Sequence, residues 1–148
     1  MTEPDPDSPT PARGRAPSRR VAPSVTPRAR LGAAGERLAA LALERAGLRI
    51  VARNWHCLYG EIDLIAEDDQ RGELVFVEVK TRRGDRLGTP EEAITPAKRR
   101  RVIAAAQTYL AEREYQQRPY RIDVAAVDLD PDGHLRGVRL HHRAITEE

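Results

Sequence analysis

The sequence predicts an α/β fold, a mixed sheet of four to five strands flanked by helices, in the order α-β-β-β-α-β-β. Two stretches rich in helix-forming residues and five short runs with β-branched or alternating apolar residues support this prediction. The second helical stretch lies between the third and fourth runs. Because a helix between two strands is the usual connection for parallel neighbours, we expect a three-strand meander, a helical crossover and a sheet covered on both faces.

The first helix is predicted from Gly35 to Ala46, where alanine, leucine, glutamate and arginine favour helix. Leu38, Leu41 and Ala42 share one face, which we expect to be apolar and buried. Gly47 is the expected C-terminal cap. Three predicted strands follow, at Leu48–His56, Glu61–Ala66 and Glu73–Thr81, and residues 67–72 form the turn between the last two.

The second long helix is predicted to begin at Thr95-Pro96, an N-cap followed by proline at the first helical position, and to reach about Glu114. Its expected inward side chains are Val102, Ile103, Ala106 and Leu110. The remaining strands are predicted at Arg121–Leu129 and Leu135–His141, with the last one at an edge of the sheet.

The chain of 148 residues is predicted to form one domain, residues 31–148, after a disordered tail, residues 1–30. The tail contains seven of the eleven prolines, is rich in arginine and shows no apolar periodicity. Of the net charge of +2, the tail carries +3, which leaves −1 for the rest. The domain is therefore nearly neutral, and nucleic-acid binding has to be argued from local clusters of charge.

Composition also narrows the location of the protein. The sequence holds no apolar stretch near the roughly 18 residues that a membrane span requires, so we expect a soluble protein without a membrane partner. Cys57 is the only cysteine, which excludes an internal disulfide and a cysteine-based zinc site. A lone cysteine fits the reducing cytosol, and we expect a cytoplasmic protein.

The strongest functional signal is Glu78-Val79-Lys80, which ends an apolar run. Residues two apart in a strand share a face, so Glu78 and Lys80 point the same way. The lysine is unusual, because Lys80 and Lys98 are the only lysines in a chain that otherwise uses arginine. A compact titratable amine is thus placed beside a carboxylate.

Asp63 is brought toward Glu78 by the predicted hairpin. Antiparallel partners have a constant index sum, and a turn centred between Asp69 and Arg71 gives sums of about 138 to 142; the pair Asp63 and Glu78 has the sum 141. We therefore expect the two residues to lie opposite each other or one diagonal step apart, with Cβ atoms about 5–8 Å apart. Whether both point to the same face depends on the register.

Two carboxylates that meet on a strand pair repel each other unless a cation lies between them. A small set of oxygen ligands favours Mg²⁺ or Mn²⁺. Lys80 beside such an ion would orient or deprotonate a water molecule or stabilise charge on phosphorus, which suits phosphodiester hydrolysis. Glu61 is expected to support the turn or the ligands. The alternative is an ion-pair cluster on a half-exposed sheet, worth under about 1 kcal/mol.

The motifs of the chain resemble those of the YraN-type family of small bacterial proteins. The matching segments are Gly32-x-x-Gly35-Glu36, Asn54-Trp55, Gly60-Glu61-Ile62-Asp63-Leu64-Ile65 and Val77-Glu78-Val79-Lys80-Thr81-Arg82. The resemblance covers roughly residues 31–143, and its motifs are specific together, although Glu-x-Lys alone is common. It implies a restriction-endonuclease-like core of the PD-(D/E)XK nuclease superfamily, in a branch similar to Holliday-junction resolvases.

Carried over residue by residue, the resemblance implies that Asp63 and Glu78 are metal ligands and that Lys80 positions the attacking water. Glu36 matches an additional acid on the first helix that helps to hold the metal in the archaeal Holliday-junction resolvase branch. The implied cofactor is Mg²⁺ or Mn²⁺. One departure is Ile62, which stands where the superfamily motif has proline.

Two groups of basic residues are expected to contact nucleic acid. They are Arg82, Arg83 and Arg86 after the third strand, and Lys98, Arg99, Arg100 and Arg101 at the start of the second long helix. Cations in a first helical turn oppose the helix dipole by a few tenths of a kcal/mol each, which a phosphate would offset. The alternative for the second group is a solvated face. Trp55 and Tyr59 are expected either to stack on a base or to pack.

Two functional hypotheses remain at this point. The first is a metal-dependent nuclease-like protein that hydrolyses phosphodiester bonds in DNA, with branched or damaged DNA as substrates. A homodimer is compatible with it, because structure-specific relatives act as pairs across two strands. The second is a non-catalytic nucleic-acid-binding or protein-interaction module that retains the nuclease fold, which the nearly neutral domain favours.

Overall fold

The computed structural model describes residues 27–84 and 94–147, and the structural statements below concern those residues. In chain order the elements are α1 (Pro27–Arg45), β1 (Arg49–Cys57), β2 (Gly60–Asp68), β3 (Glu73–Arg83), α2 (Pro96–Glu112), β4 (Tyr120–Leu129) and β5 (Leu135–Ile145). The predicted order α-β-β-β-α-β-β is confirmed. Residues 1–26 of the expected tail and Arg86 lie outside the described residues.

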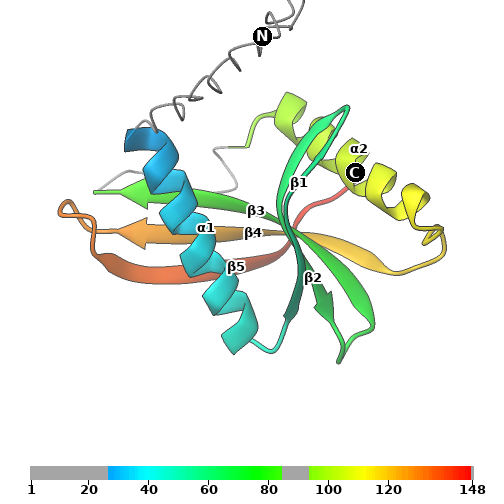
Figure 1. The fold of residues 1–148 in the computed structure, drawn as a ribbon, viewed down its shortest axis with the longest axis horizontal. Coiled ribbons are helices and arrows are strands. Elements are labelled where there is room, and N and C mark those ends of the chain that lie inside the picture. Colours follow the sequence, from blue (N-terminus) through cyan, green and yellow to red (C-terminus); the bar gives the residue numbers. More distant parts are fainter. Residues whose placement is uncertain (1–26, 85–93, 148) are drawn as a thin grey trace, which may run out of the picture.

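The five strands form one mixed sheet in the order β1-β2-β3-β4-β5 (Figure 1). The pairs β1–β2, β2–β3 and β4–β5 are antiparallel, whereas β3 and β4 are parallel. The connection between the parallel pair contains α2, as the sequence predicted, and β5 lies at the edge of the sheet.

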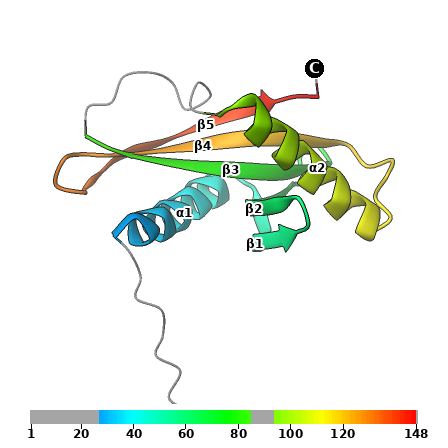
Figure 2. The ribbon, with the colours of Figure 1, turned by 90° about the horizontal axis from the view of Figure 1, so that it is seen from above.

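The two helices cover opposite faces of the sheet. Along β3, Leu74 and Phe76 pack in the apolar cluster that contains α2, whereas Val75 and Val77 pack in the cluster that contains α1. This is the alternation expected of a strand that is buried on both sides. Figure 2 shows α1 against one side of β3–β5, with α2 beginning on the other side.

The helix ends follow the sequence signals, with one exception. Thr95 caps α2, since its Oγ1 accepts a hydrogen bond from the Lys98 N–H at 3.2 Å, and Gly47 ends α1 with φ +91°. The exception is the start of α1, which lies at Pro27 and not at Gly35. Neither helix in the described part of the chain is long and apolar enough to cross a membrane.

The buried face of α1 also differs from the prediction. Ala39, Ala40 and Leu43 are buried, whereas Leu41, predicted to face inward, is 50% exposed. Small side chains line the contact because the helix lies very close to the sheet: a Cβ at Gly35 would lie 1.8 Å from the Oγ1 of Thr81. The buried stripe of α1 is thus set by this close approach and not by the largest apolar side chains. The inward residues predicted for α2 are buried or partly buried.

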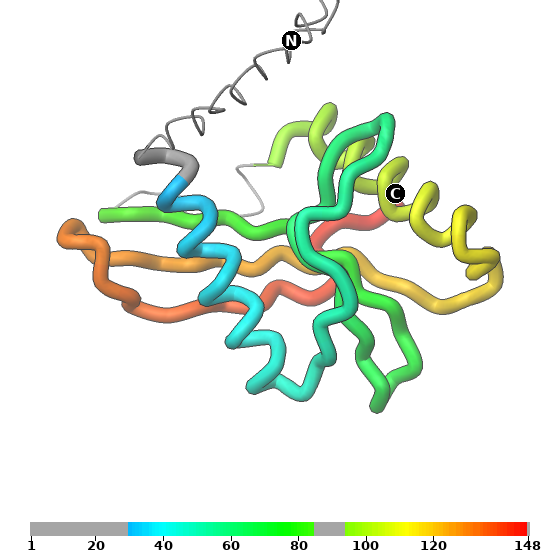
Figure 3. The backbone as a smooth tube through the Cα atoms, in the orientation of Figure 1, coloured from blue at the N-terminus to red at the C-terminus, as the bar shows by residue number. Residues whose placement is uncertain are grey.

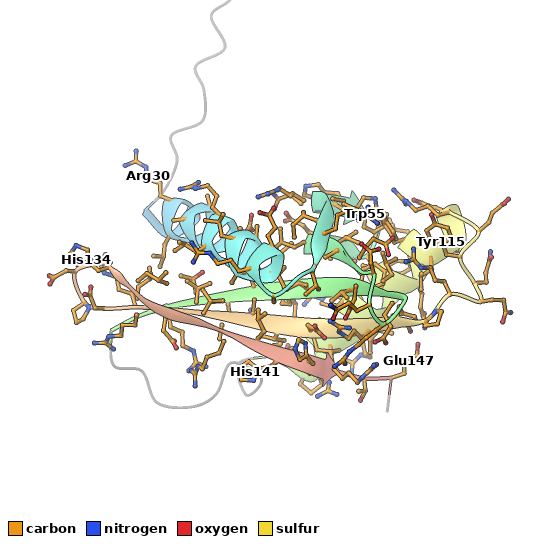
Figure 4. All side chains as sticks on the ribbon, turned by 90° about the horizontal axis from the view of Figure 1, so that it is seen from below. Arg30, Trp55, Tyr115, His134, His141 and Glu147 are labelled. Carbon is orange, nitrogen blue, oxygen red and sulfur yellow. The ribbon has the colours of Figure 1, made fainter. Side chains whose placement is uncertain are left out.

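A buried ion-pair network lies at the start of β3 and on the adjoining part of β4. Arg121, whose side chain is 2% exposed, donates hydrogen bonds to Asp123, Asp68 and Glu73. Arg143 also donates two hydrogen bonds to the Glu73 carboxylate. The buried acids of this network, Glu73 and Asp123, therefore each have an arginine partner. Glu147 lines the same region as Arg121, and Figure 4 shows that Glu147 lies at the opposite end of the molecule from Arg30.

Candidate active site

The candidate site lies where β2 and β3 separate. Their pairing runs from Asp68 opposite Glu73 to Leu64 opposite Val77, an index sum of 141 that lies within the predicted range of about 138 to 142. Beyond Leu64, β2 remains paired with β1, whereas β3 continues beside β4. The β1–β2 hairpin accordingly runs across the direction of β4 and β5 (Figure 3). Asp63 is the first residue of β2 at this separation.

The Asp63 carboxylate lies in the opening between the two strands. Its Oδ2 accepts a hydrogen bond from the Val79 N–H at 2.8 Å, in place of the backbone carbonyl that a continuing strand would offer. Burial raises the pKa of Asp63, and the nearby charge of Glu61 raises it further, although the Val79 N–H and the two lysines oppose the rise. Asp63 is therefore held in a fixed position near the face of β3 that carries Glu78.

Glu78 is a buried carboxylate, with only 5% of its side chain exposed, and not a member of a surface ion-pair cluster. Two ammonium groups approach the same oxygen, Oε1: Lys98 Nζ lies 3.3 Å away and Lys80 Nζ lies 3.9 Å away. Burial, together with the charge of Asp63, raises the pKa of Glu78 to about 7 against the opposing effect of the lysines. The two lysines therefore do not offset the free-energy cost of ionising Glu78 in this buried position.

A second group of carboxylates adjoins Asp63. Oxygen atoms of Glu36, Glu61 and Asp63 all lie within 4.8 Å of one another. Asn54, with its amide nitrogen facing these acids, donates hydrogen bonds to Glu61 at 2.7 Å and to Glu36 at 3.0 Å. Burial raises the pKa of Glu36, the charge of Asp63 adds to the rise, and the Asn54 hydrogen bond opposes it. Side chains from α1, β1 and β2 therefore converge on one point.

The side chains of Glu36, Asp63 and Glu78 line a cavity of about 980 Å³. Its lining consists of Arg30, Leu31, Gly32, Glu36, Asp63, Glu78, Val79, Lys80, Thr81 and Arg83. The first turns of α1 form one wall, and Gly35 allows that wall to approach Thr81, next to Lys80. The glycines of the Gly32-x-x-Gly35-Glu36 motif thus lie where the helix meets the site.

The four residues that the resemblance assigned to the metal and to water, Glu36, Asp63, Glu78 and Lys80, line this one cavity. Two further residues belong to the same region. Glu61, expected only to support the turn or the ligands, contributes a carboxylate to the acidic group, and Asn54 joins it to Glu36. The period of two already places Glu61 on the same face as Asp63, so that signal was present in the sequence.

The basic residues predicted to contact nucleic acid lie in several environments. Lys98 is directed at Glu78, while Arg99 is half-buried and Arg100 and Arg101 are exposed. Arg83 lines the cavity and donates a hydrogen bond to the Pro131 carbonyl at 2.8 Å. Arg82 is half-buried on β3.

The two aromatic residues considered for base stacking also differ from each other. The ring of Trp55 packs edge to face against that of Tyr109, with centroids 5.2 Å apart. Figure 4 shows Trp55 on the β1–β2 hairpin. Tyr59, at the tip of the same hairpin, is 49% exposed. Packing therefore accounts for Trp55, whereas Tyr59 remains accessible to a partner.

Comparison with known sequences places these residues within a family. Residues 35–127 match the family described as "Uncharacterised protein family UPF0102". A UPF0102 protein of Symbiobacterium thermophilum is 55% identical over 107 residues, which cover 72% of this chain and 89% of that protein. A UPF0102 protein of Nocardia farcinica is 52% identical over 115 residues, covering 78% and 87%. One from Mycolicibacterium smegmatis is 49% identical over 116 residues, covering 75% and 94%.

Proposed function

The chain belongs to the protein family UPF0102, and we propose that it is a metal-dependent nuclease that hydrolyses phosphodiester bonds in DNA. The observation that carries the proposal is the buried Glu78, which lies close to Asp63 and Lys80 in an open cavity. The motif resemblance to the PD-(D/E)XK superfamily supports the same function, and the mixed sheet is compatible with that fold.

The charges around the cavity fit a divalent cation. The carboxylates of Glu36, Asp63 and Glu78 lie together in this cavity, with Glu61 beside them and two lysines near Glu78. Carboxylate oxygens are ligands that Mg²⁺ and Mn²⁺ prefer. Burial is the main cause of the raised pKa values of Glu36, Asp63 and Glu78, and a bound cation would lower all three by favouring the charged carboxylates.

In this proposal, Glu36, Asp63 and Glu78 hold the ion, with Glu61 beside them. When bound, the ion polarises a phosphoryl oxygen and stabilises the charge that develops on it. Lys80 lies next to Glu78 and positions a water molecule through an N–H donor. The water oxygen would add to phosphorus and give up one proton to solvent, one P–O ester bond would break, and the leaving oxygen would take a proton from solvent, so that one water molecule is consumed.

DNA would be held by the cations around the cavity. Arg83 lines it directly, and the exposed Arg100 and Arg101 extend from the start of α2. The motif resemblance to the Holliday-junction resolvase branch is the reason for including branched and damaged DNA in the proposal. A homodimer would place two such sites on two strands.

Cleavage of plasmid, single-stranded and four-way-junction DNA with Mg²⁺ or Mn²⁺ tests the proposal. Wild-type protein should cleave at least one substrate, and Glu78→Gln and Lys80→Ala should each reduce the rate by 100-fold or more, on the order expected for loss of a catalytic group. Glu112→Gln, a change at an exposed glutamate on α2, is the matched control and should cleave like wild type. Equal rates for wild type and both site variants would exclude this site as the source of the activity.

The contacts of Glu78 favour one alternative function. Because two lysines already approach this carboxylate, the fold could retain the site as a structural ion-pair cluster in a nucleic-acid-binding or protein-interaction module. Calorimetry separates the two functions. A nuclease site should bind Mn²⁺, and Asp63→Asn should abolish the binding, whereas a module without a metal site should give no Mn²⁺ signal in either protein.

A further inference from the structure

Both lysines of the chain contact one oxygen atom. Lys80 and Lys98 are the only lysines among 25 basic residues, and their ammonium groups lie 3.9 Å and 3.3 Å from Oε1 of Glu78. Lys80 is two residues from Glu78 on the same strand, so its proximity follows from strand geometry. Lys98 comes from a different element, is twenty residues away in sequence, and lies closer. Its position therefore requires a separate explanation.

The start of α2 fixes the place of Lys98 at an electrostatic cost. Its backbone N–H donates to the Thr95 side chain, which caps the helix, and Pro96 is the first helical residue. A cation in this first turn is disfavoured by the helix dipole. The contact with the buried Glu78 carboxylate offsets that cost. The side chain of Lys98 is 36% exposed, against 5% for Glu78, so the ammonium group borders solvent.

From this geometry we infer that Lys98 is a displaceable counter-ion of the metal site. In the metal-free protein its ammonium group neutralises the Glu78 carboxylate. When a divalent cation binds, the ammonium group moves away from Glu78 and the lysine is then able to contact a phosphate. The inference rests on the proposed function, because it concerns the same cavity. Lys98, expected from the sequence to contact nucleic acid, is in this inference also the counter-ion of Glu78 in the metal-free protein.

The choice of lysine suits this role. An arginine can hold a carboxylate through two parallel hydrogen bonds, as Arg118 does with Glu67 through its Nη1 and Nη2 atoms. A lysine offers a compact charge on a flexible stem and forms a single-point contact that is released more easily. The chain therefore uses arginine at a permanent ion pair and lysine where the cation must leave.

Calorimetric titration of Mn²⁺ into metal-free protein at pH 8 tests the inference. Lys98→Met should bind Mn²⁺ at least about fivefold more tightly than wild type, because the repulsion between the ammonium group and the metal ion is lost. Lys98→Arg keeps the charge and can hold Glu78 through two hydrogen bonds, so it should bind Mn²⁺ more weakly than wild type. Arg37→Met is the matched control, since it removes one exposed positive charge next to Glu36 in sequence, and it should bind like wild type.

Thermal unfolding gives a second readout. In EDTA, Lys98→Met should unfold at a lower temperature than wild type, and saturating Mn²⁺ should raise its Tm by more than it raises that of wild type. Lys98→Gln replaces Lys98→Met if the latter does not fold without metal. Mn²⁺ binding by wild type with equal or weaker binding by Lys98→Met, or by Lys98→Gln in its place, would overturn the role of Lys98 alone. Absence of Mn²⁺ binding in every protein would overturn both this role and the proposed function.

Discussion

Replacing Glu78 with glutamine removes the charge of a buried carboxyl group and preserves its size. Burial and the charge of Asp63 raise the pKa of Glu78 to about 7, from an ordinary value of 4.5, despite the two lysines. Because one pKa unit corresponds to about 1.4 kcal/mol, ionising this group in the folded protein costs about 3 kcal/mol more than in the unfolded chain.

The sign of the effect follows from the direction of the pKa change. The folded protein binds the proton of Glu78 more tightly than the unfolded chain does, since the folded pKa is the higher one. The resulting stabilisation is complete below a pH of about 4.5 and is lost as the pH rises through about 7. Glutamine stays neutral throughout. The stability of Glu78→Gln relative to wild type should therefore increase by about 3 kcal/mol between pH 4.5 and pH 8.

Urea denaturation followed by circular dichroism, in EDTA at pH 5 and pH 8, measures this difference. Glu112→Gln, at a glutamate whose side chain is 58% exposed, should show no such change between the two pH values. Adding Mn²⁺ at pH 8 should stabilise wild type and reduce the advantage of Glu78→Gln. If the stability of Glu78→Gln relative to wild type does not increase between pH 5 and pH 8, the pKa of Glu78 is not raised in the folded protein and the reasoning is refuted.

Two further changes test how the fold supports the site. Gly35→Ala should destabilise the protein by about 1–3 kcal/mol, because the new Cβ would lie 1.8 Å from Thr81 Oγ1. A Cβ at Gly32 would have no atom within 4 Å, so Gly32→Ala should stabilise α1 by up to about 1 kcal/mol. Thermal unfolding measures both changes. Arg121→Ala should lower the free energy of unfolding by about 3–5 kcal/mol, because the carboxylate partners of Arg121 stay buried. The same change at the exposed Arg45 should lower it by less than about 1 kcal/mol. Equal losses for the two variants in urea denaturation would contradict this prediction.

Much of the fold could be predicted because local signals agree with the global arrangement. Thr95-Pro96 and Gly47 mark helix ends through their backbone chemistry, and alternation marks the strands. The hairpin register could be narrowed to a few values because the turn between β2 and β3 is short. The exposure of Leu41 could not be predicted, since the close approach of Gly35 to Thr81, a residue of a distant strand, helps to determine which face of α1 is buried.

For the candidate site too, contacts between distant elements could not be predicted from local patterns. Asp63, Glu78 and Lys80 could be grouped from the sequence because they lie on one hairpin, where index sums and the period of two apply. Glu36 was reached through the motif resemblance alone. The approach of Lys98 to Glu78 is a contact between α2 and β3, which no local rule specifies. The rarity of lysine in the chain was the one sequence feature that set Lys98 apart.

The two acidic clusters along β3 serve as controls for each other. At one end, hydrogen bonds from Arg121 lower the pKa of Asp68, so that carboxylate is stabilised as an anion by the protein alone. At the other end, burial raises the pKa of Asp63 and Glu78, although two lysines are present. The same sheet can therefore neutralise its acids when arginines are placed beside them. Asp63 and Glu78 differ from Asp68 in both respects, because they are more deeply buried and, among the described residues, have no arginine hydrogen bond, and this difference supports the cation site that we propose.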